Sequence, residues 1–152
     1  MLKKNIIIIS LILFLVNCGF TPVHLKNDNV NFAIEQVNFT GDRELNNFLK
    51  TYLNQYKNEN INNKVFIETE SKYKKIILSK DGAWEVTNYQ LEAEVIFLIK
   101  SNNRKIRFVE KKIMNSMDDK FEEARFERSV KQNFASSIAN KLSTELIIYK
   151  WF

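Results

Sequence analysis

The chain has 152 residues, of which 45% are hydrophobic and 27% are charged, and its formal net charge is +5. This length and apolar content predict one domain with a single packed core, and they argue against a disordered chain or a multidomain enzyme. One Cys excludes an intrachain disulfide, and a chain with one Cys, one His and three Gly has neither metal-spaced ligands nor a glycine-rich phosphate loop.

The N-terminal residues have the pattern of a bacterial export signal. Lys3 and Lys4 precede an apolar stretch at residues 6–16 that only Ser10 interrupts. As a helix this stretch reaches about 16 Å, which is short of the ~30 Å hydrocarbon layer but typical of a signal-peptide core. We therefore expect residues 1–17 to be a lipoprotein signal peptide.

The end of this stretch resembles the lipobox of bacterial lipoproteins. Its residues are Leu15, Val16, Asn17 and Cys18, with Asn17 where the family pattern usually has Gly, Ala or Ser. The resemblance implies that Cys18 becomes the first mature residue and carries the acyl chains, palmitate among them, that hold the protein on the membrane. Gly19 follows the Cys in place of an Asp retention signal, which favours the outer membrane, facing the periplasm. The alternative is a buried Cys in an uncleaved anchor helix.

The regular elements begin after a tether. Residues 18–31 hold the only Pro and the only His among polar neighbours, so they are predicted to be a lipidated tether to one globular domain at residues 32–152. A strand is expected over residues 30–39, with a bulge near Glu35 and Gln36. A helix is expected from Asp42 to about Asn58, because its apolar residues lie on one helical face, and Thr40 or Asp42 can cap it.

The remaining pattern is mostly β. Residues 65–78 predict one long strand or two short ones, residues 87–100 alternate clearly, and residues 101–104 form a turn into a strand at 105–117. A last helix is expected over residues 118–149, with Phe121 and Ala124 opening its apolar stripe. The order β-α-β-β-β-α predicts an α+β two-layer sandwich, with about four mostly antiparallel strands and two helices on one face.

Catalytic chemistry finds little support in the sequence. His24 lies in the predicted tether, and the chain has no second His for an acid–base arrangement. The pairs Glu68 with Glu70 and Glu92 with Glu94 share strand faces, but nothing places them across a cleft as glycoside hydrolysis requires. We expect solvated strand faces, no enzyme and no cofactor.

An acidic cluster opens the last predicted helix, at Asp118, Asp119, Glu122 and Glu123. Carboxylates suit Ca²⁺, but the glycine-containing loop of alternating oxygen ligands is missing. Acidic groups also stabilise the positive end of a helix. This second interpretation is favoured, and no metal site is predicted.

Basic residues form three groups along the chain. They are Lys72, Lys74, Lys75 and Lys80; Arg104, Lys105, Arg107, Lys111 and Lys112; and Lys120, Arg125, Arg128 and Lys131. Such groups often contact nucleic acid, which an exported lipoprotein does not meet. An anionic lipid or glycolipid is therefore the expected partner, and dispersed solubilising charge is the alternative for any one residue.

The whole mature chain resembles the lipopolysaccharide-assembly lipoproteins, the LptE-like family. The residues that carry the resemblance are Cys18-Gly19-Phe20 with Pro22, Thr40-Gly41-Asp42-Arg43-Glu44-Leu45, Tyr89-Gln90-Leu91, and Phe134-Ala135-Ser136-Ser137-Ile138-Ala139-Asn140-Lys141-Leu142. The resemblance implies an outer-membrane protein that plugs a large β-barrel, assists its assembly and contributes to lipopolysaccharide insertion. It also implies contact with lipopolysaccharide through basic residues, for which Lys80, Lys120 and Arg125 are candidates by location.

A second function stays open at this point. Ile96, Leu98, Phe108 and Ile113 place apolar groups on both sides of the predicted hairpin, as a periplasm-facing lipid carrier could use. A carrier needs an apolar cavity of several hundred Å³. The alternative to the barrel plug is therefore a lipid carrier or a generic envelope lipoprotein.

Overall fold

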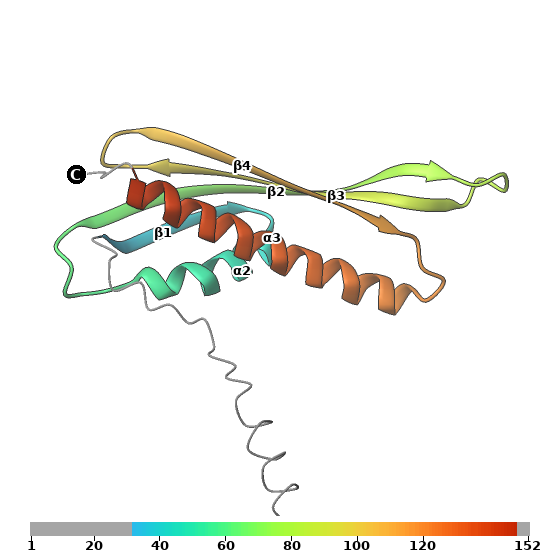
Figure 1. Ribbon diagram of the computed structural model, residues 1–152, viewed down its shortest axis with the longest axis horizontal. Coiled ribbons are helices and arrows are strands. Elements are labelled where there is room, and N and C mark those ends of the chain that lie inside the picture. The colour runs from blue at the N-terminus through green and yellow to red at the C-terminus, as the bar shows by residue number, and fades with distance from the viewer. Residues whose placement is uncertain (1–31, 149–152) are drawn as a thin grey trace, which may run out of the picture.

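The computed structural model describes residues 32–148, which form a four-stranded sheet with two helices against it (Figure 1). The elements are β1 (Ala33–Gly41), α2 (Arg43–Leu53), the 3₁₀ turn η1 (Asn54–Tyr56), β2 (Lys64–Lys80), β3 (Val86–Ile99), β4 (Arg104–Asn115) and α3 (Lys120–Ile148). Their order, β-α-β-β-β-α, confirms the predicted fold class. The predicted signal peptide and the tether, with Cys18 and His24, lie outside the described residues.

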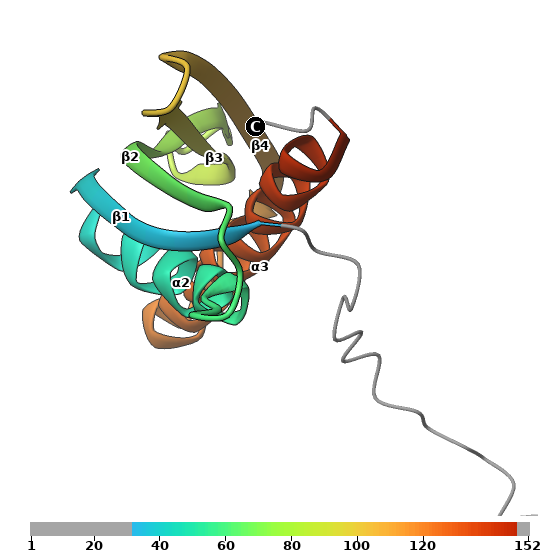
Figure 2. The ribbon, with the colours of Figure 1, turned by 90° about the vertical axis from the view of Figure 1, so that its left-hand side faces the viewer.

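The sheet has the strand order β1-β2-β3-β4. α2 carries the chain back so that β1 and β2 pair in parallel, and the β2–β3 and β3–β4 pairs are antiparallel. The register shift between Ile34 and Gln36 is the predicted bulge, and the segment after residue 64 forms one long strand. Figure 2 shows α2 and α3 beneath the same face of the curved sheet.

β3 lies at the centre of the core. Its odd-numbered residues from Leu91 to Ile99 face the helices and are completely buried, as their alternation predicts. Both helices pack one apolar stripe against this row, namely Leu45, Leu49 and Leu53 of α2 and Val130, Phe134, Ile138, Leu142 and Leu146 of α3. Burying a Leu, Ile or Phe side chain contributes about 1.5–3 kcal/mol, so this layer is the main source of stability.

A tight junction joins β1 to α2. Gly41 has a φ of +97°, and a Cβ there would lie 1.8 Å from the Ser71 carbonyl oxygen. Asp42 caps the helix, because its Oδ1 accepts a hydrogen bond from the Leu45 N–H at 2.8 Å. The predicted helix entry is confirmed, and Asp42 rather than Thr40 is the cap.

The helix ends and the start of the α3 stripe differ from the prediction. α2 ends at Leu53 and continues as one 3₁₀ turn before the asparagine-rich segment, and α3 begins at Lys120 rather than at residue 118. Phe121 is 70% exposed and Ala124 is exposed too, so their place in the buried stripe was wrong. The inward position in these turns belongs to Glu123, which pairs with a lysine of β2.

Candidate functional site

The β2–β3 hairpin projects past the start of α3 (Figure 1), and we call residues 76–89 the distal hairpin. Its turn is built on Asp81, whose Oδ1 accepts hydrogen bonds from the Ala83 and Glu85 N–H groups at 2.9 Å each. Trp84 has a φ of 65° and is 80% exposed. The turn therefore holds a large aromatic side chain out into solvent.

Aliphatic side chains extend this exposed surface along β2. Ile76, Ile77 and Leu78 are all exposed, with Ile77 at 51%. Ile76 pairs with Gln90, which pairs in turn with the exposed Ile113 of β4, so one row of the sheet presents two isoleucines to solvent. Neighbouring residues of a strand point to opposite faces, and Ile77 therefore lies on the other side. The distal hairpin is apolar on both faces, as docking surfaces often are.

Cations accompany the apolar side chains. The Lys80 Nζ lies 5.5 Å from the centroid of the Trp84 ring, and the Lys75 Nζ lies 4.3 Å from that of Tyr89. Among residues 32–148 Lys80 forms no ion pair with a carboxylate, so its charge is available to a ligand. Exposed aromatic and aliphatic groups beside the unpaired cation of Lys80 suit an anionic amphiphile.

Lys75 and Glu123 form an ion pair beneath the distal hairpin, in which the Glu123 side chain is buried and the Lys75 side chain is 28% exposed. The Lys75 Nζ donates to Glu123 Oε1 at 2.7 Å and to Glu127 Oε2 at 3.1 Å. Glu123 also accepts from the Met117 N–H and from the Lys120 Nζ, both at 3.1 Å. This network ties the start of α3 to the strand that carries the distal hairpin.

The network shifts the pKa values of both partners. The hydrogen bond from Lys75, then that from the Met117 N–H, lowers the pKa of Glu123 to about 2. Burial of the ammonium by itself lowers the pKa of Lys75, but its hydrogen bonds to Glu123 and Glu127 outweigh this and raise it. Both groups are therefore charged across the neutral range.

The three basic residues singled out from the sequence lie at the same end of the fold, but no contact joins Lys80 to the other two among the described residues. Lys120 donates to Glu123 and to the Met117 carbonyl oxygen. Arg125 donates to Glu122 at 2.8 Å. Because only Lys80 lacks a carboxylate partner, it is the strongest of the three candidates. The pairing of Lys75 with Glu123 was not predicted, since the two residues are 48 positions apart and no local pattern links them.

The carboxylates of β2 and β3 lie on the outer face of the sheet, away from the helices. Each forms an ion pair, namely Glu68 with Lys100 at 2.6 Å, Glu70 with Lys72 at 2.8 Å, Glu92 with Lys111 at 3.0 Å and Glu94 with Arg107 at 2.6 Å. The hydrogen bond from Arg107 lowers the pKa of Glu94. These side chains make a charged and internally paired surface.

The acidic residues at the start of α3 contact different partners. The Asp119 Oδ1 accepts from the Phe121 N–H at 2.8 Å and caps α3. Glu122 pairs with Arg125, and Glu123 points inward to Lys75. Within residues 32–148 no group of three or more His, Cys, Asp or Glu side chains has the arrangement to hold a metal ion.

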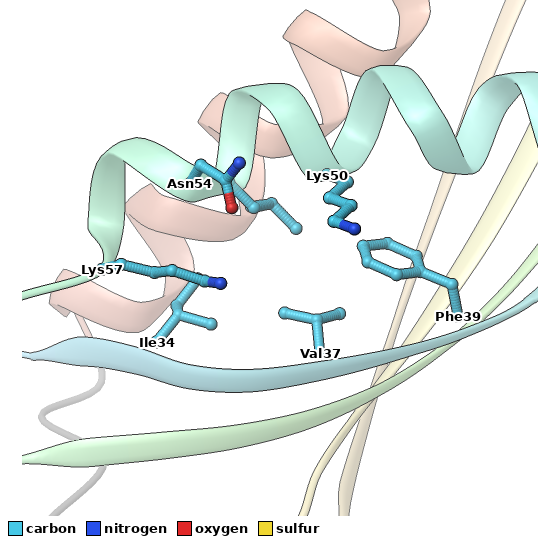
Figure 3. Close-up of a pocket in the computed structure, with 7 residues that line it drawn as sticks. Ile34, Val37, Phe39, Lys50, Asn54 and Lys57 are labelled. Atoms are coloured by element: carbon cyan, nitrogen blue, oxygen red, sulfur yellow. The ribbon is translucent and has the colours of Figure 1, made fainter.

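A small pocket lies between β1 and α2 (Figure 3). Ile34, Val37 and Phe39 form its floor, and the side chains of Lys50 and Lys57 reach over it. Its volume is about 40 Å³, which is far below the several hundred Å³ of a pocket for a drug-sized ligand.

The four apolar residues that suggested a carrier do not line one cavity. Ile96 and Leu98 are paired with outward-facing residues of β2 and β4, and Ile113 is outward as well. Phe108 pairs with the buried Val95 and faces α3. These residues therefore lie on opposite faces of the sheet.

The fold is similar to solved structures of bacterial lipoproteins. Rare lipoprotein B from Shewanella oneidensis matches with a TM-score of 0.53 and 12% identity, over 73% of this chain and 92% of that chain. A minor lipoprotein from Acinetobacter baumannii matches with a TM-score of 0.51 and 16% identity, over 77% of this chain and 95% of that chain. No family model matches the sequence, nor is any curated protein significantly similar to it. Among the described residues, neither α2 nor α3 has an apolar stretch of membrane-spanning length. The chain thus has the fold of these two lipoproteins.

Proposed function

We propose that this protein is a lipoprotein of the bacterial outer membrane, anchored through Cys18 on the periplasmic side. It occupies the lumen of a lipopolysaccharide-translocating β-barrel, assists the assembly of that barrel and contributes to lipopolysaccharide insertion. The observation that carries the proposal is the coincidence of a lipobox-like Cys18 with a fold similar to two bacterial lipoproteins.

The outer face of the sheet supports the role as a plug. A barrel lumen is lined by polar side chains, and a protein that fills it needs a hydrogen-bonding exterior over a separate core. The ion pairs of Glu92 with Lys111 and Glu94 with Arg107 give the outer face this character, while the apolar core lies between the sheet and the helices.

The distal hairpin supports contact with lipopolysaccharide. Lipopolysaccharide carries phosphates and acyl chains, and Lys80 beside Trp84 and Leu78 offers a free cation next to exposed apolar groups. Charge pairing with Lys80 and burial of Trp84 and Leu78 would act on the two parts of the ligand together. The β1–α2 pocket is too small for an acyl chain, and the larger groove between β4 and α3, of about 460 Å³, is lined by polar side chains apart from Phe108. The proposed contact is therefore on the surface rather than in an apolar carrier cavity.

The anchor is tested by Cys18→Ser in cells fed a labelled fatty acid. We expect the variant to lose the label and to remain an uncleaved precursor. Asn17→Ala is the matched control, because it changes the neighbouring residue and leaves the acceptor thiol in place. Normal processing and labelling of Cys18→Ser would contradict lipidation at this residue.

The lipopolysaccharide contact is tested with the full chain purified in detergent. Leu78→Ala and Lys80→Gln are each expected to weaken binding of labelled lipopolysaccharide several-fold. Phe66→Ala is the matched control, because Phe66 lies near the other end of β2 and is 45% exposed against 47% for Leu78. Equal losses for Leu78→Ala and Phe66→Ala would place the contact elsewhere.

A further inference from the structure

The two edges of the sheet differ in a way that bears on protein partners. β1 is a short edge of nine residues, and its pairing with β2 is broken by the bulge after Ile34. β4 is the other edge, with twelve residues paired to β3 in one uninterrupted register from Arg104 to Asn115. Bulges and short strands protect sheet edges from further pairing, so β1 is protected and β4 is not.

The backbone of β4 is open on its outer side. In the part of the chain that the structure describes, no strand lies beyond β4 in the sheet. In an antiparallel edge strand every second residue directs its N–H and C=O groups away from its neighbour. Along β4 these groups form a row of donors and acceptors that can accept a further strand.

A groove runs beside this edge, between β4 and α3. Its volume is about 460 Å³, and it is lined by Phe108, Ser137, Asn140, Lys141, Thr144 and Glu145. Phe108 is the strand's contribution, and the polar side chains come from the flank of α3. An edge strand with a groove at its side is the arrangement that proteins use to bind extended peptides, since the backbone supplies affinity and the groove receives alternate side chains.

The charge of β4 selects the kind of partner. The strand contains one acidic residue, Glu110, and five basic ones, which are Arg104, Lys105, Arg107, Lys111 and Lys112. Arg107 and Lys111 are paired with Glu94 and Glu92 of β3, whereas Lys105 and Lys112 form no ion pair among residues 32–148. An added strand about 4.8 Å from β4 would therefore meet an excess of positive charge, with Lys105 on the outer face of the sheet. A second copy of β4 would bring like charges together, and β1 contains no cation at all.

We propose that the outer edge of β4 binds an acidic, extended segment of a partner protein. The segment adds to the sheet as a fifth strand, its acidic side chains on the outer face approach Lys105, and its side chains on the helix side enter the β4–α3 groove. This interaction surface is independent of the lipid contact at the distal hairpin and of the barrel proposal.

The test uses the full chain in detergent and a capped ten-residue peptide of alternating Val and Glu as the probe. Hydrogen exchange read by mass spectrometry should slow in residues 104–115 and remain unchanged in residues 33–41. A peptide with Lys in place of Glu should bind at least tenfold more weakly. Lys105→Glu should weaken binding of the acidic peptide about two- to fivefold, as expected for one cross-strand charge pair.

Two adjacent proline variants test the backbone contact. Arg107→Pro and Phe108→Pro place the ring at neighbouring residues, of which one directs its N–H to β3 and the other outward. Circular dichroism should show that the outward one remains folded, and that variant should lose peptide binding. If neither variant folds, the exchange pattern and the Lys105→Glu result decide the matter.

Three results would overturn the proposal. The first is equal binding of the basic and acidic peptides, and the second is peptide-induced protection of residues 33–41 rather than 104–115. The third is protection of residues 104–115 without peptide, together with a dimer in analytical ultracentrifugation, which would make a second copy the occupant of the edge.

Discussion

Replacing Glu123 with Gln removes the buried charge that joins α3 to β2 and keeps the size of the side chain. Glu123 accepts hydrogen bonds from Lys75, the Met117 N–H and Lys120, and its side chain is 6% exposed. Its pKa falls from an ordinary 4.5 to about 2 in the folded chain, which corresponds to at most about 3 kcal/mol. Lys75 retains its contact with Glu127 in the variant. We therefore expect Glu123→Gln to reduce the free energy of unfolding by about 2 kcal/mol at pH 7.

The pH dependence gives this prediction a second readout. A carboxyl whose folded pKa is lowered stabilises the fold above its unfolded pKa and loses this stabilisation as the pH falls through the folded value. The difference in the free energy of unfolding between wild type and Glu123→Gln should therefore be constant above about pH 5. It should narrow between pH 4.5 and pH 2, the unfolded and folded pKa values of this group.

Urea unfolding followed by circular dichroism measures both effects. Glu122→Gln is the matched control, because Glu122 is the adjacent carboxylate in an exposed ion pair with Arg125, and such pairs contribute about 0–1 kcal/mol. The reasoning is refuted if the two variants lose equal stability at pH 7, or if the Glu123→Gln deficit persists unchanged at pH 2.5.

Three further predictions concern the β1–α2 junction and the hairpin turn. Gly41→Ala should lower the free energy of unfolding by about 3 kcal/mol or more, because its Cβ would meet the Ser71 carbonyl and the residue has a positive φ. A melting temperature within about 2 °C of wild type, which corresponds to a loss of less than about 1 kcal/mol, would contradict this. Asp42→Ala should cost about 1 kcal/mol in urea unfolding through loss of the helix cap, and Asp42→Asn should recover most of it. Trp84→Ala should change the free energy of unfolding by less than about 0.5 kcal/mol, because the side chain is 80% exposed. The same variant should weaken lipopolysaccharide binding in a pull-down. A large loss of stability would mean that Trp84 is part of the core.

The sequence was sufficient to predict burial where the local hydrophobic pattern of an element matches the face that it buries in the fold. Alternation over residues 89–99 predicted the buried row of β3, because a half-buried strand exposes every second residue. The spacing of Leu45, Leu49 and Leu53 predicted the inward face of α2 in the same way. Each of these patterns follows from the periodicity of a single strand or helix that buries one face. It can therefore be recognised without knowing which element packs against that face.

Prediction failed where a distant residue determines the environment. Phe121 continues the apolar spacing of α3 but is exposed, because Glu123 takes the inward position to meet Lys75 of β2. A carboxylate is buried only when a partner compensates its charge, and that partner lies in another element. The candidate site was predicted in part for the same reason. Lys80 was named from its place at the hairpin, whereas the ion pair of Lys75 with Glu123 and the exposure of Trp84 and Leu78 required the structure.

The measurement that tests the central proposal most directly is purification of the tagged full chain from its native outer membrane. The proposal predicts that a large β-barrel protein co-purifies in a 1:1 complex, and that the charge reversals Glu92→Lys and Glu94→Lys on the outer sheet face reduce its recovery while the protein stays lipidated and folded. Recovery of the lipidated protein as a monomer without a barrel would contradict the proposal.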